Sequence, residues 1–287
     1  MIVRWPAEAI WEAVEPLLPG FTVEILPEID STNTELMRRA RAGRLEPVLL
    51  VAERQTAGRG RLGRDWLSSH GGGVGGHFAA GPPQGEIAPL GGSDPRSGGA
   101  WGLTFSLGLP LAPQDWSGLS LAVGLSIVQS LHPRLRLKWP NDVWLDERKL
   151  GGILIETASF GAERYVVIGI GINLVAPDAT DLRTRPAGLR ELVAEVQAPD
   201  LLEHVAAPLV RAVQRFAAQG FGPLVGAYQE RDLLYGRAVV CSDGVTGVAR
   251  GVNADGALLV HTENGLRKIT SAEVSVRPVP DSTADFL

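Results

Sequence analysis

The sequence predicts an α+β fold in two parts: a large domain over residues 1–234 and a small antiparallel β-barrel over residues 235–287. Two observations carry this prediction. Up to residue 234, segments with strand-like alternation of apolar and polar residues are interspersed with segments of helical spacing. From residue 235 on, short strand-like runs are separated by SDG, NADG and ENG turns, a pattern typical of a small antiparallel sheet.

The first strand is expected over residues 21–29, where FTVEILPEI alternates apolar and polar positions. A helix is expected next, over residues 30–43. Thr32 and Glu35 have the spacing of a capping box, and Gly43 suits the end of the helix.

Residues 71–99 are rich in Gly, Pro and Ser without periodicity, which predicts a mobile surface insertion.

The remaining elements follow from the same periodicities. Strands are expected at residues 47–53, 101–111 and 164–175, an apolar helix at 119–132, and helical segments at 186–234. Residues 134–157 are expected to form a strand, then a Pro-Asn turn, then a hairpin whose turn lies around residues 146–148.

Composition excludes several classes of function. The 27 basic and 32 acidic residues give a net charge of −5, whereas a general nucleic-acid binder has a basic balance. The single cysteine, Cys241, excludes an intramolecular disulfide framework and a cysteine-rich zinc site. No stretch approaches the roughly 20 apolar residues of a membrane span. We therefore expect a cytoplasmic protein that does not associate with membranes.

The segment AERQTAGRGRLGRDW, residues 52–66, contains four arginines and three glycines. Guanidinium groups are planar, bidentate donors to phosphate or carboxylate, and glycines let backbone N–H groups approach the same anion. The alternative is an exposed, solvated turn.

Two lysine-containing segments are further candidates. In LKWPNDVW, Lys138 and Asp142 suit substrate binding and Mg²⁺ coordination near phosphates, or else form an ordinary turn with a surface ion pair. Lys149 precedes Gly151 and Gly152, which remove side-chain bulk and permit a ligand to approach closely. The alternative for Lys149 is simple solvation.

The segment GIGIN, residues 169–173, lies in an apolar strand. It is not a dinucleotide-binding fingerprint, because neither a third glycine nor an opening helix follows. Its small residues indicate close packing against something flat, a ligand or another backbone, with ordinary core packing as the alternative.

Together and in this order, these motifs resemble those of the biotin protein ligase family. The resemblance runs from Phe21 to the end of the chain, because the terminal β-domain is similar to that family's Src-homology-3-like barrel. It implies a mixed-sheet catalytic domain of the biotin/lipoate ligase type. The motifs that carry it are Ser31-Thr32-Asn33, Gln55 with GRGRLGR and Trp66, KWPND, the run from Lys149 to Glu156, and GIGIN.

The resemblance implies an enzyme that condenses biotin with ATP, using Mg²⁺, to biotinyl-5′-adenylate. It would then pass biotin to a lysine of a biotin carboxyl carrier protein. The alternatives are a biotin- or adenylate-sensing module without ligase activity, and a nucleic-acid binder that uses the arginine loop. Regulatory members carry an N-terminal helix-turn-helix domain, for which the segment before Phe21 is too short. We therefore expect a non-regulatory ligase without sequence-specific DNA binding, either a monomer or a homodimer.

Individual roles are implied in the same way. The catalytic residues would be Lys149, Arg59, Arg61, Asp142 and Lys138, with Asp142 as the Mg²⁺ ligand. Biotin would contact Ser31, Thr32, Asn33, Gln55, Gly58, Arg59, Arg61, Lys149, Gly151 and Gly152. The nucleotide would contact Arg59, Arg61, Arg64, Trp66, Asn141, Lys149, Gly171 and Asn173.

Overall fold

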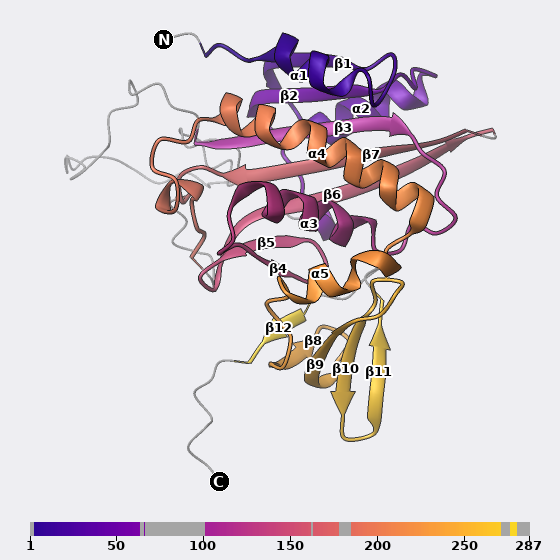
Figure 1. The fold of residues 1–287 in the computed structure, drawn as a ribbon, viewed down its shortest axis with the longest axis vertical. Helices are drawn as coiled ribbons and strands as arrows, with labels where there is room; N and C mark the ends of the chain where they lie inside the picture. Colours follow the sequence, from indigo (N-terminus) through magenta and orange to yellow (C-terminus); the bar gives the residue numbers. More distant parts are fainter. Residues whose placement is uncertain are drawn as a thin grey trace, which may run out of the picture.

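The computed structural model describes residues 3–63, 66, 101–161, 163–177, 185–270 and 276–279. These residues form a seven-stranded mixed sheet with helices on both faces and a separate five-stranded antiparallel sheet (Figure 1). The predicted α+β class is confirmed. The insertion expected over residues 71–99 lies outside the described residues, and the domain boundary at residue 234 stays a prediction.

The larger sheet has the strand order β1-β2-β3-β7-β6-β5-β4. Strands β1 and β2 are parallel, and every other neighbouring pair is antiparallel. Its strands are β1 (Thr22–Ile29), β2 (Val48–Gln55), β3 (Gly102–Pro110), β4 (Arg136–Lys138), β5 (Asp142–Leu145), β6 (Arg148–Phe160) and β7 (Glu163–Asn173).

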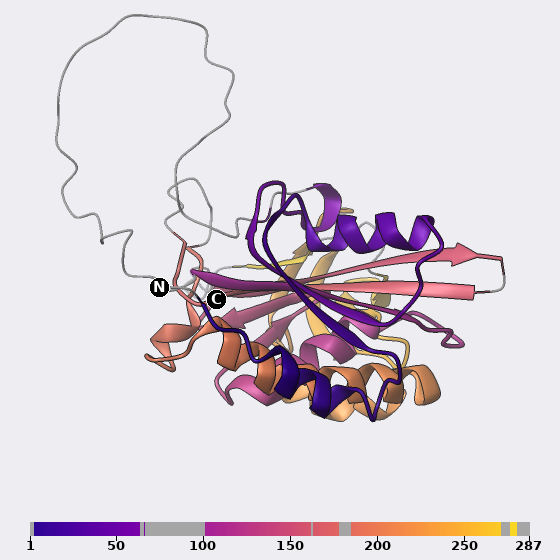
Figure 2. The same cartoon turned by 90° about the horizontal axis from the view of Figure 1, so that it is seen from above.

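The helices divide between the two faces of this sheet. Helices α1, α3 and α4 cover one face and α2 covers the other (Figure 2). Only part of the predicted helical region 186–234 is helical: residues 192–197, 220–221 and 230–234 form turns, bends or irregular backbone. The helices are α1 (Ala7–Val14), α2 (Thr32–Arg41), α3 (Leu119–Leu131), α4 (Ala198–Gln219) and α5 (Val225–Gln229), with short 3₁₀ turns at Arg61–Gly63, Leu189–Glu191 and Gly222–Leu224.

Strand alternation gives the two faces different characters. In β3, Leu103, Phe105 and Leu107 belong to the main apolar core, which also contains the buried residues of α3 and α4. The intervening Thr104 and Ser106 therefore face the α2 side. The central strands thus carry an apolar surface toward α3 and α4. Toward α2 they carry polar residues such as Thr104 and Ser106 together with a second apolar cluster, in which Leu50 and Val167 pack with Leu36 of α2.

The N-cap of helix α2 lies one residue earlier than predicted. The N-cap is Ser31, which has an extended backbone, and its Oγ accepts a hydrogen bond from the Thr34 N–H at 3.4 Å. The predicted capping box is wrong: Thr32 is the first helical residue, and its side chain contacts Gln55. The carboxylate of Glu35 pairs with Arg39 at 2.8 Å instead.

The expected hairpin around residues 146–148 joins β5 to β6. Its loop residues Asp146 and Glu147 have φ values of 45° and 63°. Two positive φ values in a two-residue loop are typical of a type I′ turn, which matches the twist of antiparallel strands. The hairpin brings Asp142 of β5 and Lys149 of β6 onto neighbouring strands.

The smaller sheet contacts the rest of the chain through the turn that contains Gly256, which meets Trp139 and Gly118, the N-cap of α3. The buried Trp139 indole donates a hydrogen bond to the Gly256 carbonyl at 3.0 Å. A Cβ on Gly256 would lie 2.7 Å from the Gly118 Cα, so the two backbones touch. No described helix has the length and apolarity needed to cross a membrane. The strands of the smaller sheet, in the order β11-β10-β9-β8-β12, are β8 (Ala238–Cys241), β9 (Thr246–Val252), β10 (Leu258–Thr262), β11 (Gly265–Ile269) and β12 (Val276–Pro278).

Candidate active site

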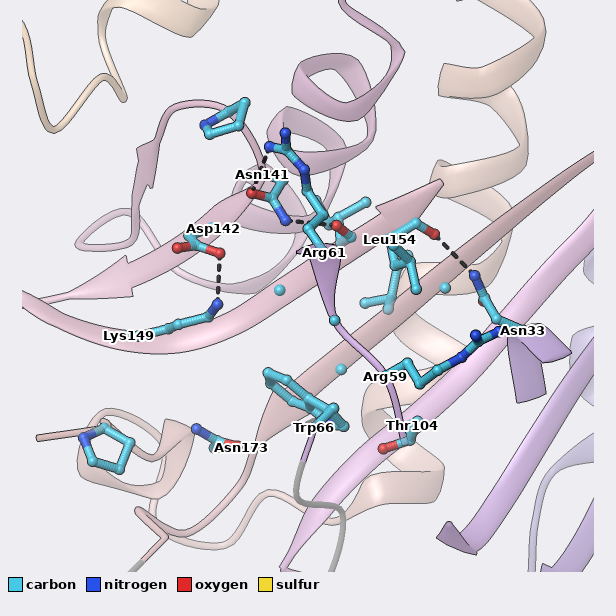
Figure 3. A pocket seen from close by; sticks show the side chains of 18 of the residues that line it. Asn33, Arg59, Arg61, Trp66, Thr104, Asn141, Asp142, Lys149, Leu154 and Asn173 are labelled. Carbon is cyan, nitrogen blue, oxygen red and sulfur yellow. Dashed lines mark hydrogen bonds and ion pairs between the residues drawn. The ribbon is translucent and has the colours of Figure 1, made fainter. Parts of the chain in front are cut away.

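A cavity of about 760 Å³ is lined by residues of β2 to β7, the N-terminus of α2 and the loop after β2, and Figure 3 shows its side chains. Most residues predicted for the site line it. They are Ser31, Thr32, Asn33, Gln55, Arg59, Arg61, Trp66, Lys138, Asn141, Asp142, Lys149, Gly152, Gly171 and Asn173. The predicted Gly58 and Gly151 are not among the lining residues, and Arg64 lies outside the described residues.

One end of the cavity is lined by uncharged polar side chains, with the guanidinium of Arg59 at its edge, where it donates to Thr34 Oγ1. The Thr32 N–H donates to Gln55 Oε1 at 2.8 Å, and the Thr32 hydroxyl lies 3.1 Å from the same oxygen. Ser31, Thr32, Asn33 and Gln55 are all buried. Buried polar groups that are already paired can recognise an uncharged polar ligand with little reorganisation.

Sequence reasoning missed two side chains behind this polar end. The fully buried Ser106 places its Oγ 2.7 Å from Thr32 Oγ1 and 2.6 Å from Asn33 Oδ1. Glu156 accepts a hydrogen bond from Asn33 Nδ2 at 2.9 Å. Polar residues at alternate positions of the apolar strand LTFSLGL, Thr104 and Ser106, are the signal that could have identified Ser106.

Glycines of β7 let two side chains lie against the sheet. A Cβ on Gly169 would be 2.1 Å from Asn33 Oδ1, and a Cβ on Gly171 would be 2.3 Å from the Trp66 indole ring. The flat group that packs against GIGIN is the indole of Trp66, a side chain, rather than the ligand or backbone that was expected. The backbone N–H of Trp66 donates to the Gly58 carbonyl at 2.9 Å, which closes the loop that carries the arginines.

The other end of the cavity contains the lysines and the KWPND turn. Lys149 Nζ lies 2.7 Å from Asp142 Oδ1 and 6.0 Å from the centre of the Trp66 ring. Lys138 Nζ lies 5.0 Å from the centre of the Trp144 ring. The carboxylate of Asp142 thus forms its ion pair with Lys149.

The two arginines of the loop lie on opposite sides of the cavity, Arg59 beside Asn33 and Arg61 beside Asn141 (Figure 3). Arg59 donates to Thr34 Oγ1 at 2.9 Å. Arg61 donates to Asn141 Oδ1 at 3.4 Å, which connects the loop to the KWPND turn.

The charges in the cavity favour an anion. Among the described residues, its lining includes four cationic side chains, Arg59, Arg61, Lys138 and Lys149, and a single carboxylate, Asp142. Cations gathered in a concave site raise the local concentration of anionic ligands. Over the described ranges, no three His, Cys, Asp or Glu side chains are grouped as metal ligands. A single carboxylate fits Mg²⁺ that is held mainly by substrate phosphates and water.

Comparisons with known proteins agree with this geometry. A profile described as the biotin/lipoate A/B protein ligase family matches residues 109–173, and one described as the biotin protein ligase C terminal domain matches residues 237–277. The biotin–[acetyl-CoA-carboxylase] ligase of Paracoccus denitrificans is 31% identical over 259 residues, which cover 87% of this chain and 98% of that protein. The chain belongs to the biotin protein ligase family.

Two further similarities span most of the chain. The biotin–[acetyl-CoA-carboxylase] ligase of Mycobacterium tuberculosis is 32% identical over 260 residues, covering 82% of each chain. The biotin protein ligase of Aquifex aeolicus, solved in complex with biotin and ATP, superposes with a TM-score of 0.68 at 28% identity, covering 90% of this chain and 99% of that one. Membership of the biotin protein ligase family confirms the predicted enzyme class, an ATP-dependent biotin ligase.

Proposed function

We propose that the cavity holds biotin and ATP together, forms biotinyl-5′-adenylate, and then transfers the biotinyl group to a lysine of a biotin carboxyl carrier domain. The observation that carries this proposal is the division of the cavity. The uncharged side chains of Ser31, Thr32, Asn33 and Gln55 suit the ring urea of biotin, and the cationic side chains of Arg61, Lys138 and Lys149 suit a carboxylate beside a phosphate. The Trp66 indole lies against Gly171 in the wall of the same cavity.

In the first step, a carboxylate oxygen of biotin attacks the α-phosphorus of ATP and pyrophosphate leaves. Both reactants are anions, so their approach requires cations that neutralise the charge developing at phosphorus. We assign this role to Lys149 of β6 and to Arg59 and Arg61 of the loop after β2, which line the same cavity. No enzyme nucleophile is needed, because the biotin carboxylate is itself the nucleophile.

We assign Asp142 to Mg²⁺, because it is the only carboxylate among the described lining residues. The ion supplies charge neutralisation to the phosphates when it is bound. Lys149, 2.7 Å from the Asp142 carboxylate, keeps this side chain oriented toward the cavity.

In the second step, the neutral amine of the carrier lysine attacks the carbonyl carbon of the mixed anhydride. An amide bond forms, AMP leaves, and the amine gives up its proton. We propose that Lys138, Asn141 and Asp142, at the turn between β4 and β5, serve the nucleotide and the incoming lysine. Exclusion of water until the lysine arrives protects the anhydride from hydrolysis.

The proposal is tested by incubating the full chain with biotin, MgATP and a purified carrier domain, followed by detection with streptavidin. Controls omit ATP, replace Mg²⁺ by EDTA, or use a carrier whose target lysine is changed to arginine. We expect label only in the complete reaction, together with pyrophosphate release. Biotin binding without pyrophosphate release or labelling would instead indicate a sensor module.

A further inference from the structure

We propose that the buried Ser106 is a positioning residue that sets the direction of the Thr32 hydroxyl. Through it, Thr32 presents a hydrogen-bond acceptor to a ring N–H of biotin. This inference rests on the proposed function, because it takes the ring urea to be the group held at the polar end of the cavity. The orientation of the Asn33 amide and the single hydroxyl proton of Ser106 determine that direction.

The first step is the orientation of the Asn33 amide. Asn33 Nδ2 lies 2.9 Å from Glu156 Oε2 and 3.3 Å from the Leu154 carbonyl oxygen. A carboxylate and a carbonyl oxygen only accept hydrogen bonds, so the amide NH₂ group must face both of them. Asn33 Oδ1 therefore faces Ser106, 2.6 Å from its Oγ.

The second step is the direction of the two hydroxyls. Asn33 Oδ1 cannot donate, so the single proton of Ser106 is directed to it. The 2.7 Å contact between Ser106 Oγ and Thr32 Oγ1 then requires the Thr32 hydroxyl to donate to Ser106. The competing contact with Gln55 Oε1 is longer, 3.1 Å, and that oxygen already accepts the Thr32 N–H at 2.8 Å.

With its proton directed to Ser106, the Thr32 hydroxyl turns a lone pair toward the cavity that it lines. The neighbouring Ser31 has the opposite polarity. Its oxygen accepts the Thr34 N–H at the start of α2, and no group in the described ranges accepts its own proton. The cavity therefore offers a donor and an acceptor side by side, which match the C=O and the N–H of a cyclic urea.

The burial of these groups makes the direction of the hydroxyl matter. Ser31, Thr32 and Ser106 are 3%, 2% and 0% exposed. Bulk water therefore cannot supply the hydrogen bond that a ligand atom of the wrong polarity fails to make. A site built to pair with an N–H discriminates strongly against a ligand that lacks one.

The test compares biotin with the two cyclic carbamates in which one or the other ring N–H is replaced by oxygen. These analogues keep the size of the ring and turn a donor into an acceptor. In the full chain we expect at least one carbamate to bind much more weakly than biotin. Thr32→Val should remove that discrimination, since it deletes the acceptor while keeping the shape of the side chain. Discrimination that survives Thr32→Val would overturn the proposal.

Ser106→Ala frees the Thr32 hydroxyl to turn toward Gln55 or the ligand. We expect the KM for biotin to rise about tenfold, the KM for ATP and kcat to stay constant, and the discrimination against the carbamate to fall. Ser126→Ala, which removes another buried serine hydroxyl on α3, is the matched control and should leave all these constants unchanged.

A double-mutant cycle separates positioning from a merely structural role. If Ser106 acts through Thr32, adding Ser106→Ala to Thr32→Val should cause no further loss of biotin affinity. Additive losses, or an unchanged biotin KM and unchanged selectivity in Ser106→Ala, would overturn the inference. Failure of the unmodified chain to bind biotin would be a different result, because it would overturn the proposed function itself.

Discussion

The indole of Trp66 lies so close to Gly171 that a Cβ on this glycine would be 2.3 Å from indole Cε2. The indole also approaches Gly152 of the neighbouring strand β6, where a Cβ would lie 3.6 Å from indole Cζ3. Two strands of the central sheet thus leave a flat, side-chain-free surface, and a residue from the arginine loop lies on it. The loop and the sheet fit together only because position 171 lacks a side chain.

Gly171→Ala should therefore displace Trp66 and impair ligand binding more than folding, since the indole is carried by a loop and Gly171 lies near the C-terminal end of β7. We expect a roughly 10- to 100-fold loss of kcat/KM for adenylate formation with little change in thermal midpoint. Gly226→Ala is the control, because no atom lies within 4 Å of a Cβ at that position. Full activity in Gly171→Ala would show that Trp66 is not part of the site.

Lys149→Ala should lower pyrophosphate release by about 100-fold or more, the usual cost of removing a donor that stabilises charge in the transition state. The fold should survive, because the Lys149 side chain is 39% exposed. Lys268→Ala offers a matched comparison: Lys268 also lies 2.7 Å from an aspartate, Asp255, but on the smaller sheet. Equal rates for the two variants would remove Lys149 from the chemistry.

The sequence predicted most strands and helices because their periodicity is local. The alternation in residues 101–111 and 164–175 matches β3 and β7, and the turn at residues 146–148 matches the β5–β6 hairpin. The order of the strands is not a local property. The parallel pairing of β1 with β2, and the position of β7 between β3 and β6, depend on contacts between distant segments.

The site was predicted where residue types are unusual and missed where they are ordinary. Arginines between glycines and the KWPND turn are conspicuous in the sequence, and Arg59, Arg61, Asn141 and Asp142 do line the cavity. Ser106 is a common residue in a common strand. Its importance depends on the distances to Thr32 and Asn33, which only the packing of α2 against β3 establishes.

A buried carboxylate outside the site predicts a dependence of stability on pH. Burial raises the pKa of Asp232 to about 6, although the Leu234 N–H donates to its Oδ1 at 2.9 Å. Its Oδ2 is buried without a hydrogen-bond partner in the described structure, as is the hydroxyl of Tyr228. The folded state thus holds the proton more tightly than the unfolded chain, so this group destabilises the protein as pH rises from about 4 to about 6.

Asp232→Asn should remove that dependence and stabilise the protein at pH 7 by about 1–2 kcal/mol. Urea unfolding at pH values between 4 and 7 measures it. Asp255→Asn is the control of opposite sign: the Lys268 ammonium lowers the pKa of Asp255, so its contribution is lost as pH falls. If the free energy of unfolding depended on pH in the same way in the wild type and in Asp232→Asn, the assignment to Asp232 would be contradicted.

The arginine loop should become ordered when ligands bind. Arg59 and Arg61 lie on opposite sides of the cavity, and Arg61 contacts the KWPND turn at Asn141 Oδ1, 3.4 Å away. An anionic adenylate between them would supply charge-assisted hydrogen bonds that offset the backbone entropy of ordering, roughly 1–2 kcal/mol per residue. Amide exchange at residues 57–63 should therefore slow on addition of biotin with MgATP.

Arg61→Gly should abolish that protection and let the adenylate escape, because the loop then loses both a cation and its contact with the β4–β5 turn. Released biotinyl-5′-adenylate would label lysines of a bystander protein, such as serum albumin, that the unmodified enzyme leaves unlabelled. Arg54→Ala, at a guanidinium that pairs with Glu28 on the exposed edge of the sheet, should not cause such labelling. Equal exchange at residues 57–63 with and without ligands would show that the loop is already closed, and closure would then play no part in retaining the adenylate.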